Sequence, residues 1–460
     1  MKVAHVLSEW NRRWSRPQWS GPLAVVVFIG ASLFFAAHMQ RKGLLDQPPE
    51  IGGDATDYDL IAWSLSTGKG FGREAPSAEF QAPYIQAGLK PPVSSPIGPA
   101  TDRPPLYPLL LAATFRGGRQ FHVIRIVQAL CLGLVAAAVA KRVFDRAGVV
   151  PALLSSCLLL IVDPRPRTMA GEILTECVAC LLVTALFLCL ASWDQRRRWR
   201  DVVLAGVVCG LLVLCRSMLV LWLPILGLGL WSITERAQRW SAGKQIVLFS
   251  GLAVAICLPW WVRNVQVLGE FRPLGTQGTE QLSAAYSDEA FARKGMWFNL
   301  DEAGFFASIP ESAAVPRTLA RSRQSEQAAK QWIGQHPVKA ALLWPLRVFQ
   351  EFRPHGPGDL FVLALAAFGL AILWQTPEGR IARWLIAGQM VAVAATWSVA
   401  GRFVFPLLGV LHLLAAIGLW GAYVALVERR ETSRGWVLSG SDKRPDAGEL
   451  TAPPILKEPA

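Results

Sequence analysis

An aspartate close behind the first long apolar stretch has the chemistry of a general base. Asp54 stands in the run Gly53-Asp54-Ala55-Thr56-Asp57-Tyr58, and Arg103 and Tyr107 stand in Arg-Pro-Pro-Leu-Tyr-Pro just before the next apolar segment. A carboxylate can take a proton from an attacking hydroxyl, and an arginine offers a planar fork of donors to a phosphate. At one membrane face, these residue types suit group transfer from a lipid-borne phosphate.

Two other interpretations of these carboxylates have to be weighed. Aspartate is a favoured helix N-cap, so Asp54 could cap a helix predicted at 55–67. Asp57 and Asp59 form an Asp-x-Asp, the pattern with which soluble glycosyltransferases hold a metal-bound nucleotide sugar. On a helix these two side chains would point about 200° apart, which disfavours a metal clamp. No cofactor is firmly indicated; a divalent metal stays open because acidic residues are available.

Further charged residues fall at the predicted outer ends of apolar segments. Glu176 lies one helical turn beyond Glu172, and a carboxylate at a membrane boundary is costly unless it is used or solvated. We expect Glu172 to be solvated and Glu176 to be functional. Arginines are less expected on the outer side, and several of them at one face indicate an anionic ligand: Arg103, Arg216, Arg263 and Arg402.

Composition places these residues in a membrane protein. The chain has 460 residues, is 52% hydrophobic and carries a formal net charge of +13, with a mean hydropathy of +0.34. Its long uncharged runs, among them 22–38, 245–262 and 403–427, are typical of membrane helices. The basic residues follow every second apolar segment, which is the positive-inside pattern and argues against nucleic acid as a partner. The lipid bilayer is therefore an expected partner, and both termini are expected to be cytoplasmic.

The same pattern predicts an all-α polytopic protein with about 10 transmembrane helices, in a range of 9–13. Residues 1–427 form the membrane domain, with outer loops at about 39–121 and 263–357, and 428–460 form a disordered cytoplasmic tail. In the first loop we expect short interfacial helices at 55–67 and 104–115, with an irregular Pro-rich stretch at 73–102 between them. In the second loop we expect a polar helix at 316–335 and an apolar-aromatic stretch at 338–352.

Short motifs, in order along residues 20–425, resemble a known family. Gly53-Asp54 with Tyr58 and Gly68-x-Gly70-Phe71 is similar to the first outer loop of bacterial GT-C glycosyltransferases related to protein O-mannosyltransferases and aminoarabinose transferases (glycosyltransferase family 39-like). Four further segments resemble later motifs of that family: Arg103-Pro-Pro-x-Tyr107-Pro, Leu174-Thr175-Glu176, Pro259-Trp260-Trp261-Val262-Arg263-Asn264 and Arg402-Phe403-x-x-Pro406. Phe403 stands where the family usually has tyrosine.

The resemblance implies a GT-C fold in the cytoplasmic (inner) membrane and an inverting transfer of a sugar from a polyprenyl-phosphate donor to an acceptor hydroxyl at its outer face. The family's catalytic aspartate corresponds to Asp54. Arg263 and Arg402 become candidates for the donor phosphate and Glu176 for a second polar contact, and Tyr58, Arg103 and Tyr107 complete the expected substrate-binding set. The acceptor is left unknown. The alternatives are a lipid or glycolipid transporter, which would carry ionisable groups near the bilayer midplane, and a non-catalytic membrane scaffold.

Overall fold

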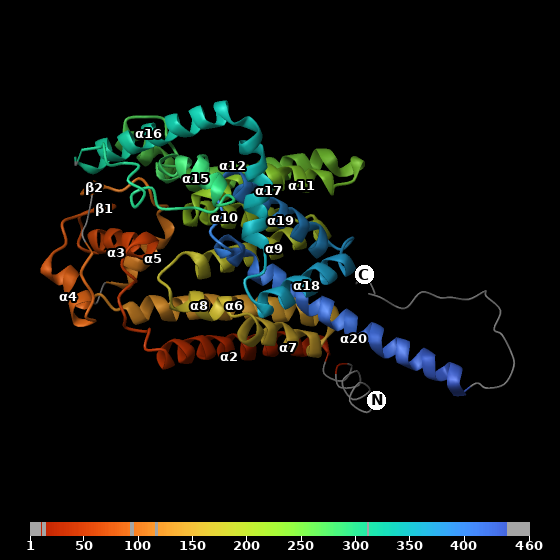
Figure 1. The fold of residues 1–460 in the computed structure, drawn as a ribbon. Helices are drawn as coiled ribbons and strands as arrows, with labels where there is room; N and C mark the ends of the chain where they lie inside the picture. Colours follow the sequence, from red (N-terminus) through yellow and green to blue (C-terminus); the bar gives the residue numbers. More distant parts are fainter. Residues whose placement is uncertain (1–10, 12–14, 93–95, 116–117, 311, 439–460) are drawn as a thin grey trace.

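The computed structural model describes residues 11, 15–92, 96–115, 118–310 and 312–438. Within these ranges the chain is almost entirely helical (Figure 1). The two short strands that it contains, β1 (Gly72–Arg73) and β2 (Gly98–Pro99), pair antiparallel, with Gly72 opposite Pro99. The predicted all-α class is confirmed.

The bundle is built from long apolar helices. In the described part of the chain, five helical stretches are long and apolar enough to cross a membrane, and the number rises to seven if each of two bent helix pairs is one span. The five are α2 (Ser20–Arg41) with its preceding 3-10 turn η1 (Pro17–Trp19), α6 (Phe121–Ala147), α9 (Glu176–Arg196), α12 (Arg239–Leu268) with its preceding η4 (Arg236–Gln238), and η5 (Arg402–Leu407) with α20 (Leu408–Leu438). The protein is therefore a polytopic membrane protein, and the predicted count of about ten spans is not confirmed.

The other segments of the bundle are shorter or bent. α7 (Val149–Cys157) runs into a π-helical turn, η2 (Leu158–Val162), and α8 (Arg165–Gly171) follows at an angle of 60°. The second bent pair joins α17 (Pro337–Phe352) to α18 (Pro357–Ile372) at 109°. The remaining helices of this part are α10 (Trp199–Cys215), η3 (Ser217–Leu221), α11 (Trp222–Ser232) and α19 (Pro377–Ala395).

Small residues allow the closest helix contacts, as is usual in membrane bundles. At Gly369 of α18 an added Cβ would lie 1.8 Å from the Leu414 carbonyl oxygen of α20, and at Gly418 of α20 it would lie 2.2 Å from that of Leu365. Both positions therefore require glycine. This contact anchors α20, whose preceding turn carries Arg402.

The outer loops differ from their predicted form in two respects. The helix predicted at 55–67 is α3 (Gly53–Ser66), but its apolar face is buried against α5 (Leu106–Thr114) rather than left free to lie on a membrane. The stretch 73–102 was expected to be irregular, yet it contains α4 (Ala78–Gln86), which tolerates Pro83 in its interior and begins at the cap Ser77. The second loop holds α13 (Gln277–Glu280), α14 (Leu282–Ala285), α15 (Asp288–Ala292), α16 (Ala314–Gln335) and α17. The polar and apolar-aromatic helices expected there are α16 and α17.

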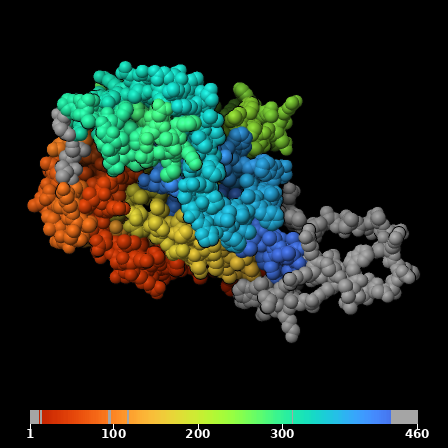
Figure 2. All heavy atoms as spheres, in the orientation of Figure 1, coloured from red at the N-terminus to blue at the C-terminus, as the bar shows by residue number. Residues whose placement is uncertain are grey.

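The two ends of the bundle carry different charges. The start of α2 and the end of α20 lie at one end, while α3, α4 and α5 lie at the other (Figure 1), and the second outer loop covers that other part of the molecule from above (Figure 2). The first end is basic, because arginine and lysine outnumber aspartate and glutamate in its segments 141–146, 194–201 and 378–383. Its acidic residues are ion-paired there: Glu378 is buried between Arg142 and Arg146, and Asp194 pairs with Arg380. α20 continues to Leu438, past the predicted end at residue 427, and the rest of the tail expected to be disordered, 439–460, lies outside the described residues.

Candidate functional site

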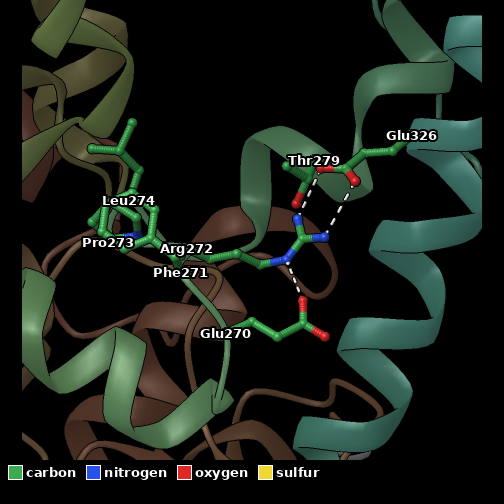
Figure 3. A pocket seen from close by; sticks show the side chains of 8 residues that line it. Glu270, Phe271, Arg272, Pro273, Leu274, Thr279 and Glu326 are labelled. Atoms are coloured by element: carbon green, nitrogen blue, oxygen red, sulfur yellow. Dashed lines mark hydrogen bonds and ion pairs between the residues drawn. The ribbon is translucent and has the colours of Figure 1, made fainter.

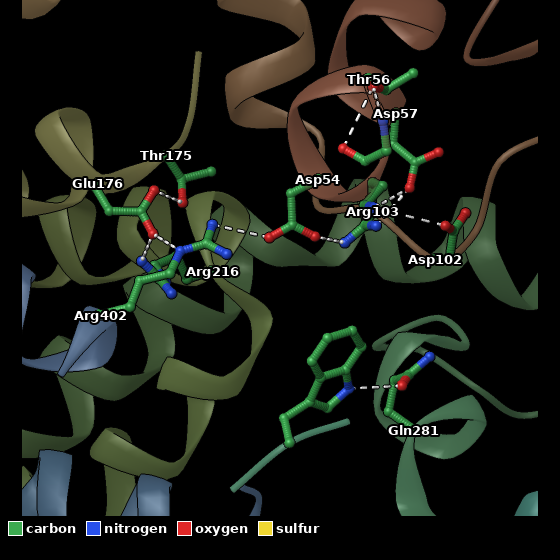
Figure 4. A network of polar contacts seen from close by, with 12 residues as sticks. Asp54, Thr56, Asp57, Asp102, Arg103, Thr175, Glu176, Arg216, Gln281 and Arg402 are labelled. Carbon is green, nitrogen blue, oxygen red and sulfur yellow. Dashed lines mark hydrogen bonds and ion pairs between the residues drawn. The ribbon is translucent and has the colours of Figure 1, made fainter. Parts of the chain in front are cut away.

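Asp54 lies near the start of α3 and does not cap it. The cap position is Gly52, whose φ of 94° favours glycine, and no side chain accepts a cap hydrogen bond there. The Asp54 carboxylate instead points away from its helix to two guanidiniums (Figure 4): Oδ1 lies 2.5 Å from Nη1 of Arg103, and Oδ2 lies 2.8 Å from Nη2 of Arg402. The capping interpretation is therefore wrong.

Arg103 continues the network within the first loop. Its Nε and Nη2 both donate to Oδ2 of Asp57, at 3.0 and 2.5 Å. Asp57 in turn accepts from Nε of Arg73 at 3.1 Å, and Arg73 holds Asp102 through two parallel hydrogen bonds of 3.0 and 2.6 Å. Because β1 carries Arg73 and the residues after β2 carry Asp102, the small sheet places this branch beside α3.

Arg402 continues the network into the bundle. Its Nε donates to Oε1 of Glu176 at 2.5 Å, and Arg216 Nη1 donates to the same oxygen at 3.1 Å. Glu176 is the first residue of α9 and is fully buried. Glu172, which was expected to be solvated, is half-buried between α8 and α9. A buried carboxylate shared by two arginines rules out a solvated surface role for Glu176.

The two arginines keep Asp54 ionised. Burial by itself raises the pKa of Asp54, but the guanidiniums of Arg103 and Arg402 outweigh it and lower that pKa to about 2. The carboxylate is a quarter exposed. At neutral pH it is therefore a charged acceptor that remains reachable, yet a weak base as long as both guanidiniums hold it.

The linked charges cancel. Along the described chain, the ion-paired network that contains Asp54 joins equal numbers of arginines and carboxylates: Arg73, Arg103, Arg216 and Arg402 with Asp54, Asp57, Asp102 and Glu176. A phosphate that entered this network would add an unbalanced negative charge. It would therefore have to displace a carboxylate from an arginine.

Two tyrosines support the arginine side of the site. Arg103 lies over the ring of Tyr58, with 5.7 Å between the guanidinium carbon and the ring centroid, and Tyr58 packs edge-on against Tyr107 at 5.2 Å. The hydroxyl of Tyr107 donates to Gln128 of α6 at 2.6 Å, and the side chain is fully buried. Tyr107 thus holds the ring of Tyr58, and Tyr58 in turn supports Arg103.

Arg263 does not join this network. Its guanidinium donates to the carbonyl oxygens of Ala100 at 2.6 Å and Phe71 at 2.9 Å, and it stacks on Trp260 at 4.7 Å. It therefore ties α12 to the small sheet that holds Arg73. Of the predicted site residues, the structure brings together Asp54, Tyr58, Arg103, Tyr107, Glu176 and Arg402, and it leaves Arg263 apart.

Four members of the network were not predicted as site residues. Asp57 was weighed only as half of a metal clamp. Arg216 was counted among the outer arginines that indicate an anionic ligand but was left out of the substrate-binding set, although its place directly after α10 was a usable signal. Arg73 and Asp102 have no such signal in the sequence, because they meet only through the pairing of β1 with β2.

The residues at Asp54 do not fit a divalent cation. Both oxygens of Asp54 contact arginines, and Asp57 also faces two arginines. Asp59 points elsewhere, to the hydroxyl of Tyr84 at 2.7 Å, as its helical spacing predicted. Over the described residues, no three histidine, cysteine or acidic side chains are grouped closely enough to hold a metal ion.

A shallow depression on the second outer loop lies apart from Asp54. It is lined by 270–275, Thr279 and Glu326, and its arginine, Arg272, is already held by Glu270 and Glu326 (Figure 3). Figure 4 also draws a different part of that loop, at Gln281, whose side chain accepts a hydrogen bond from the indole of Trp297 at 2.8 Å. The second loop contacts the first at Thr276, just before α13, whose amide donates to the Thr101 carbonyl oxygen at 3.0 Å.

Glu280, one residue before Gln281, makes the contact between the two outer loops sensitive to pH. Burial, together with repulsion from Asp102, raises the pKa of Glu280 to about 7, although Arg321 lies 3.2 Å away. The native state then binds a proton that an unfolded glutamate loses near pH 4. The stability from this group is therefore complete below about pH 4 and is lost as the pH rises through about 7.

We expect Glu280→Gln, which mimics the protonated acid, to remove this loss. In thermal unfolding of the detergent-solubilised protein, the variant should gain melting temperature over the wild type at pH 8, with a smaller gain at pH 5. Glu289→Gln, at a half-exposed position, is the matched control and should show no such trend. Equal differences at both pH values would contradict the assignment to Glu280.

Residues 102–262 match the family model described as dolichyl-phosphate-mannose-protein mannosyltransferase. The matched segment contains Arg103, Tyr107, Glu176 and Arg216, and it excludes Asp54 and Arg402. Over these residues, the resemblance to the mannosyltransferase-related GT-C family is confirmed. No curated protein sequence matches the chain.

Two solved structures of similar shape are proteins of Archaeoglobus fulgidus and Cupriavidus metallidurans. The oligosaccharyltransferase of Archaeoglobus fulgidus in the apo form has a TM-score of 0.49 at 14% identity, over 91% of this chain and 52% of that one. ArnT from Cupriavidus metallidurans bound to undecaprenyl phosphate has a TM-score of 0.39 at 13% identity, over 86% of this chain and 77% of that one. The chain thus spans about half the length of the oligosaccharyltransferase.

Proposed function

We propose that the protein is an inverting glycosyltransferase that moves a sugar from a polyprenyl-phosphate donor to an acceptor hydroxyl at the outer face of the cytoplasmic membrane. The observation that carries this proposal is the Asp54 carboxylate held between Arg103 and Arg402. A candidate base and two phosphate-binding side chains meet there at the end of the bundle opposite the basic end. The positive-inside rule makes the basic end cytoplasmic.

Arg402 is the proposed contact of the donor phosphate. It bridges Asp54 and Glu176, and its side chain is about a quarter exposed. Arg216, 9% exposed, stands behind it on the shared Glu176 oxygen. A phosphate that accepts hydrogen bonds from Arg402 replaces Asp54 as the partner of that guanidinium, which keeps the number of buried unpaired charges low.

This exchange activates the base. Arg402 contributes to the low pKa of Asp54. When Arg402 binds the phosphate instead of Asp54, the pKa of Asp54 rises towards the ordinary range of a carboxyl group. Asp54 then takes the proton of the acceptor hydroxyl. The acceptor oxygen bonds to the anomeric carbon, the bond from that carbon to the phosphate oxygen breaks, and the polyprenyl phosphate leaves with the electron pair. Arg402 stabilises the charge on the leaving phosphate.

The family description supports the class of donor. Dolichyl phosphate is a polyprenyl phosphate, and the match over residues 102–262 includes four members of the ion-paired network, Asp102, Arg103, Glu176 and Arg216. The apolar helices are long enough to cross a bilayer, and a bilayer is where a lipid-linked donor resides. The proposal leaves the sugar open between a hexose and a pentose, and the acceptor open between protein, lipid and glycan.

The direct test is sugar transfer by purified protein in lipid nanodiscs. A polyprenyl phosphate carrying a radiolabelled sugar is supplied, and release or transfer of the label is followed with candidate acceptors. Glu378→Gln, at the opposite end of the bundle, is the matched control and should transfer as the wild type does. If labelled lipid moves between leaflets without any loss of its sugar, the transporter alternative replaces the proposal.

A further inference from the structure

The turn that presents Arg402 has an unusual backbone. Ala400 has a φ of 51° and Gly401 a φ of 89°, so two successive residues before η5 adopt the left-handed region. At Gly401 an added Cβ would lie 2.8 Å from the ring of His355, just beyond α17. The turn is therefore seated on the end of α17, and something must hold it there.

Glu351 of α17 holds this turn by three hydrogen bonds. Its Oε2 accepts from the hydroxyl of Ser398 and the amide of Val399, both at 2.8 Å, and its Oε1 accepts from the amide of Phe403 at 2.5 Å. Glu351 is 1% exposed. Its donors lie on both sides of Arg402 in the sequence, so the carboxylate fixes the backbone from which that arginine extends.

Arg347, one helical turn earlier, holds the preceding segment. Its Nη1 donates to the Ala394 carbonyl oxygen at 2.7 Å, at the end of α19, and its Nη2 donates to that of Ala285 in the second outer loop. It is fully buried and stacks on Tyr286 at 4.4 Å. The Arg347 cation thus contacts the carbonyl end of α19, and the Glu351 anion contacts the amide end of η5, as helix dipoles favour.

The second outer loop is joined to the same turn. The amide of Trp297 donates to the Ser398 carbonyl oxygen at 2.9 Å, and the amide of Ser398 donates to that of Gly295 at 3.1 Å. Gly295 also lies where any Cβ would be 2.4 Å from Cγ of Arg347. The turn is therefore clamped between α17 and the loop. The hydrogen bonds of Glu351 and Arg347 go to this turn, to α19 and to the loop, and not to Asp54.

We propose that Glu351 is a positioning residue that, together with Arg347, sets the turn 398–403 so that Arg402 can bind an anionic lipid phosphate. This inference rests on the proposed function, because it takes the polyprenyl phosphate as the ligand of Arg402. Glu351 acts through Arg402 and makes no contact with the ligand. Its loss should therefore affect phosphate binding only while Arg402 is present.

The test is a double-mutant cycle on binding of polyprenyl monophosphate to the full-length protein in nanodiscs. Glu351→Gln keeps the shape of the side chain but replaces one carboxylate oxygen, an acceptor, with an NH2 group. That group is a donor and would face the donors of the turn, the backbone amides or the Ser398 hydroxyl. We expect on the order of tenfold weaker binding in the wild-type background, and less than a twofold further change in the Arg402→Gln background. Ser398→Ala, which removes one of the three donors, should give a smaller weakening with the same dependence on Arg402.

The matched control is again Glu378→Gln, since Glu378 is also a buried glutamate held by hydrogen-bond donors. It should bind the lipid as the wild type does, even if its melting temperature falls equally. Equal weakening by Glu351→Gln in both backgrounds, no weakening at all, or the same weakening in the control would overturn the positioning role. Failure of the wild type to bind the lipid would overturn the proposed function itself, and the positioning role with it.

Discussion

Asp54→Asn should lower the rate of sugar transfer by about a hundred- to ten-thousand-fold, the range that a positioned general base contributes. The change keeps the shape of the side chain but removes the charge and the ability to take a proton. The measurement is the single-turnover rate in nanodiscs at saturating donor, so that differences in donor affinity do not enter the comparison.

The same variant should not lose donor binding. Asparagine competes less for Arg402 than the Asp54 carboxylate, which lies 2.8 Å from it, so polyprenyl phosphate should bind to Asp54→Asn at least as tightly as to the wild type. Asp57→Asn is the comparison variant, because Asp57 contacts Arg103 and Arg73 but not Arg402. It should keep a much larger fraction of the wild-type transfer rate than Asp54→Asn does. Weaker donor binding by Asp54→Asn would contradict competition for Arg402.

Arg402→Gln should weaken donor binding by roughly a hundredfold, because it removes a charge-assisted contact to the phosphate and leaves Glu176 with one arginine fewer. It should also change the pH dependence of the remaining activity. Arg402 helps to hold the pKa of Asp54 at about 2, so its removal raises that pKa. The acid limb of kcat/KM should move to higher pH, because the base is then protonated at a pH at which the wild-type base is ionised.

Arg402→Lys separates charge from geometry. Lysine keeps the positive charge but lacks the fork that reaches Asp54 and Glu176 together. The acid limb should then move less than in Arg402→Gln, while donor binding should still be weakened. An unshifted acid limb in Arg402→Gln, with transfer still measurable, would show that Asp54 is not the titrating group.

Much of the site could be predicted from sequence because its residues stand at the ends of apolar segments. Asp54, Glu176 and Arg402 each lie where a membrane segment begins or a short outer helix starts, and topology alone brings such positions to one face. Arg263 meets the same criterion but contacts the carbonyl oxygens of Ala100 and Phe71. Position along the membrane normal does not tell which of several arginines turns inward.

The parts that escaped prediction depend on contacts distant in sequence. Arg73 joins Asp57 to Asp102 only because a two-residue strand pairs across the first loop. Glu351 lies in the predicted apolar-aromatic stretch 338–352 and was not predicted as a site residue, because its three donors come from a turn far along the chain. α4 was missed because proline and glycine around it favour irregular structure, whereas the cap Ser77 and burial of Phe80 and Tyr84 override that preference.

Asp54 as the base of a sugar transfer is the central claim, and one comparison tests it most directly. Wild type and Asp54→Asn are loaded to equal occupancy with radiolabelled polyprenyl-phosphate sugar, and transfer to an acceptor hydroxyl is followed in a single turnover. We predict that the wild type transfers the label and that Asp54→Asn retains it on the lipid, with a rate at least a hundredfold lower. Transfer at equal rates by the two proteins would contradict the assignment of Asp54.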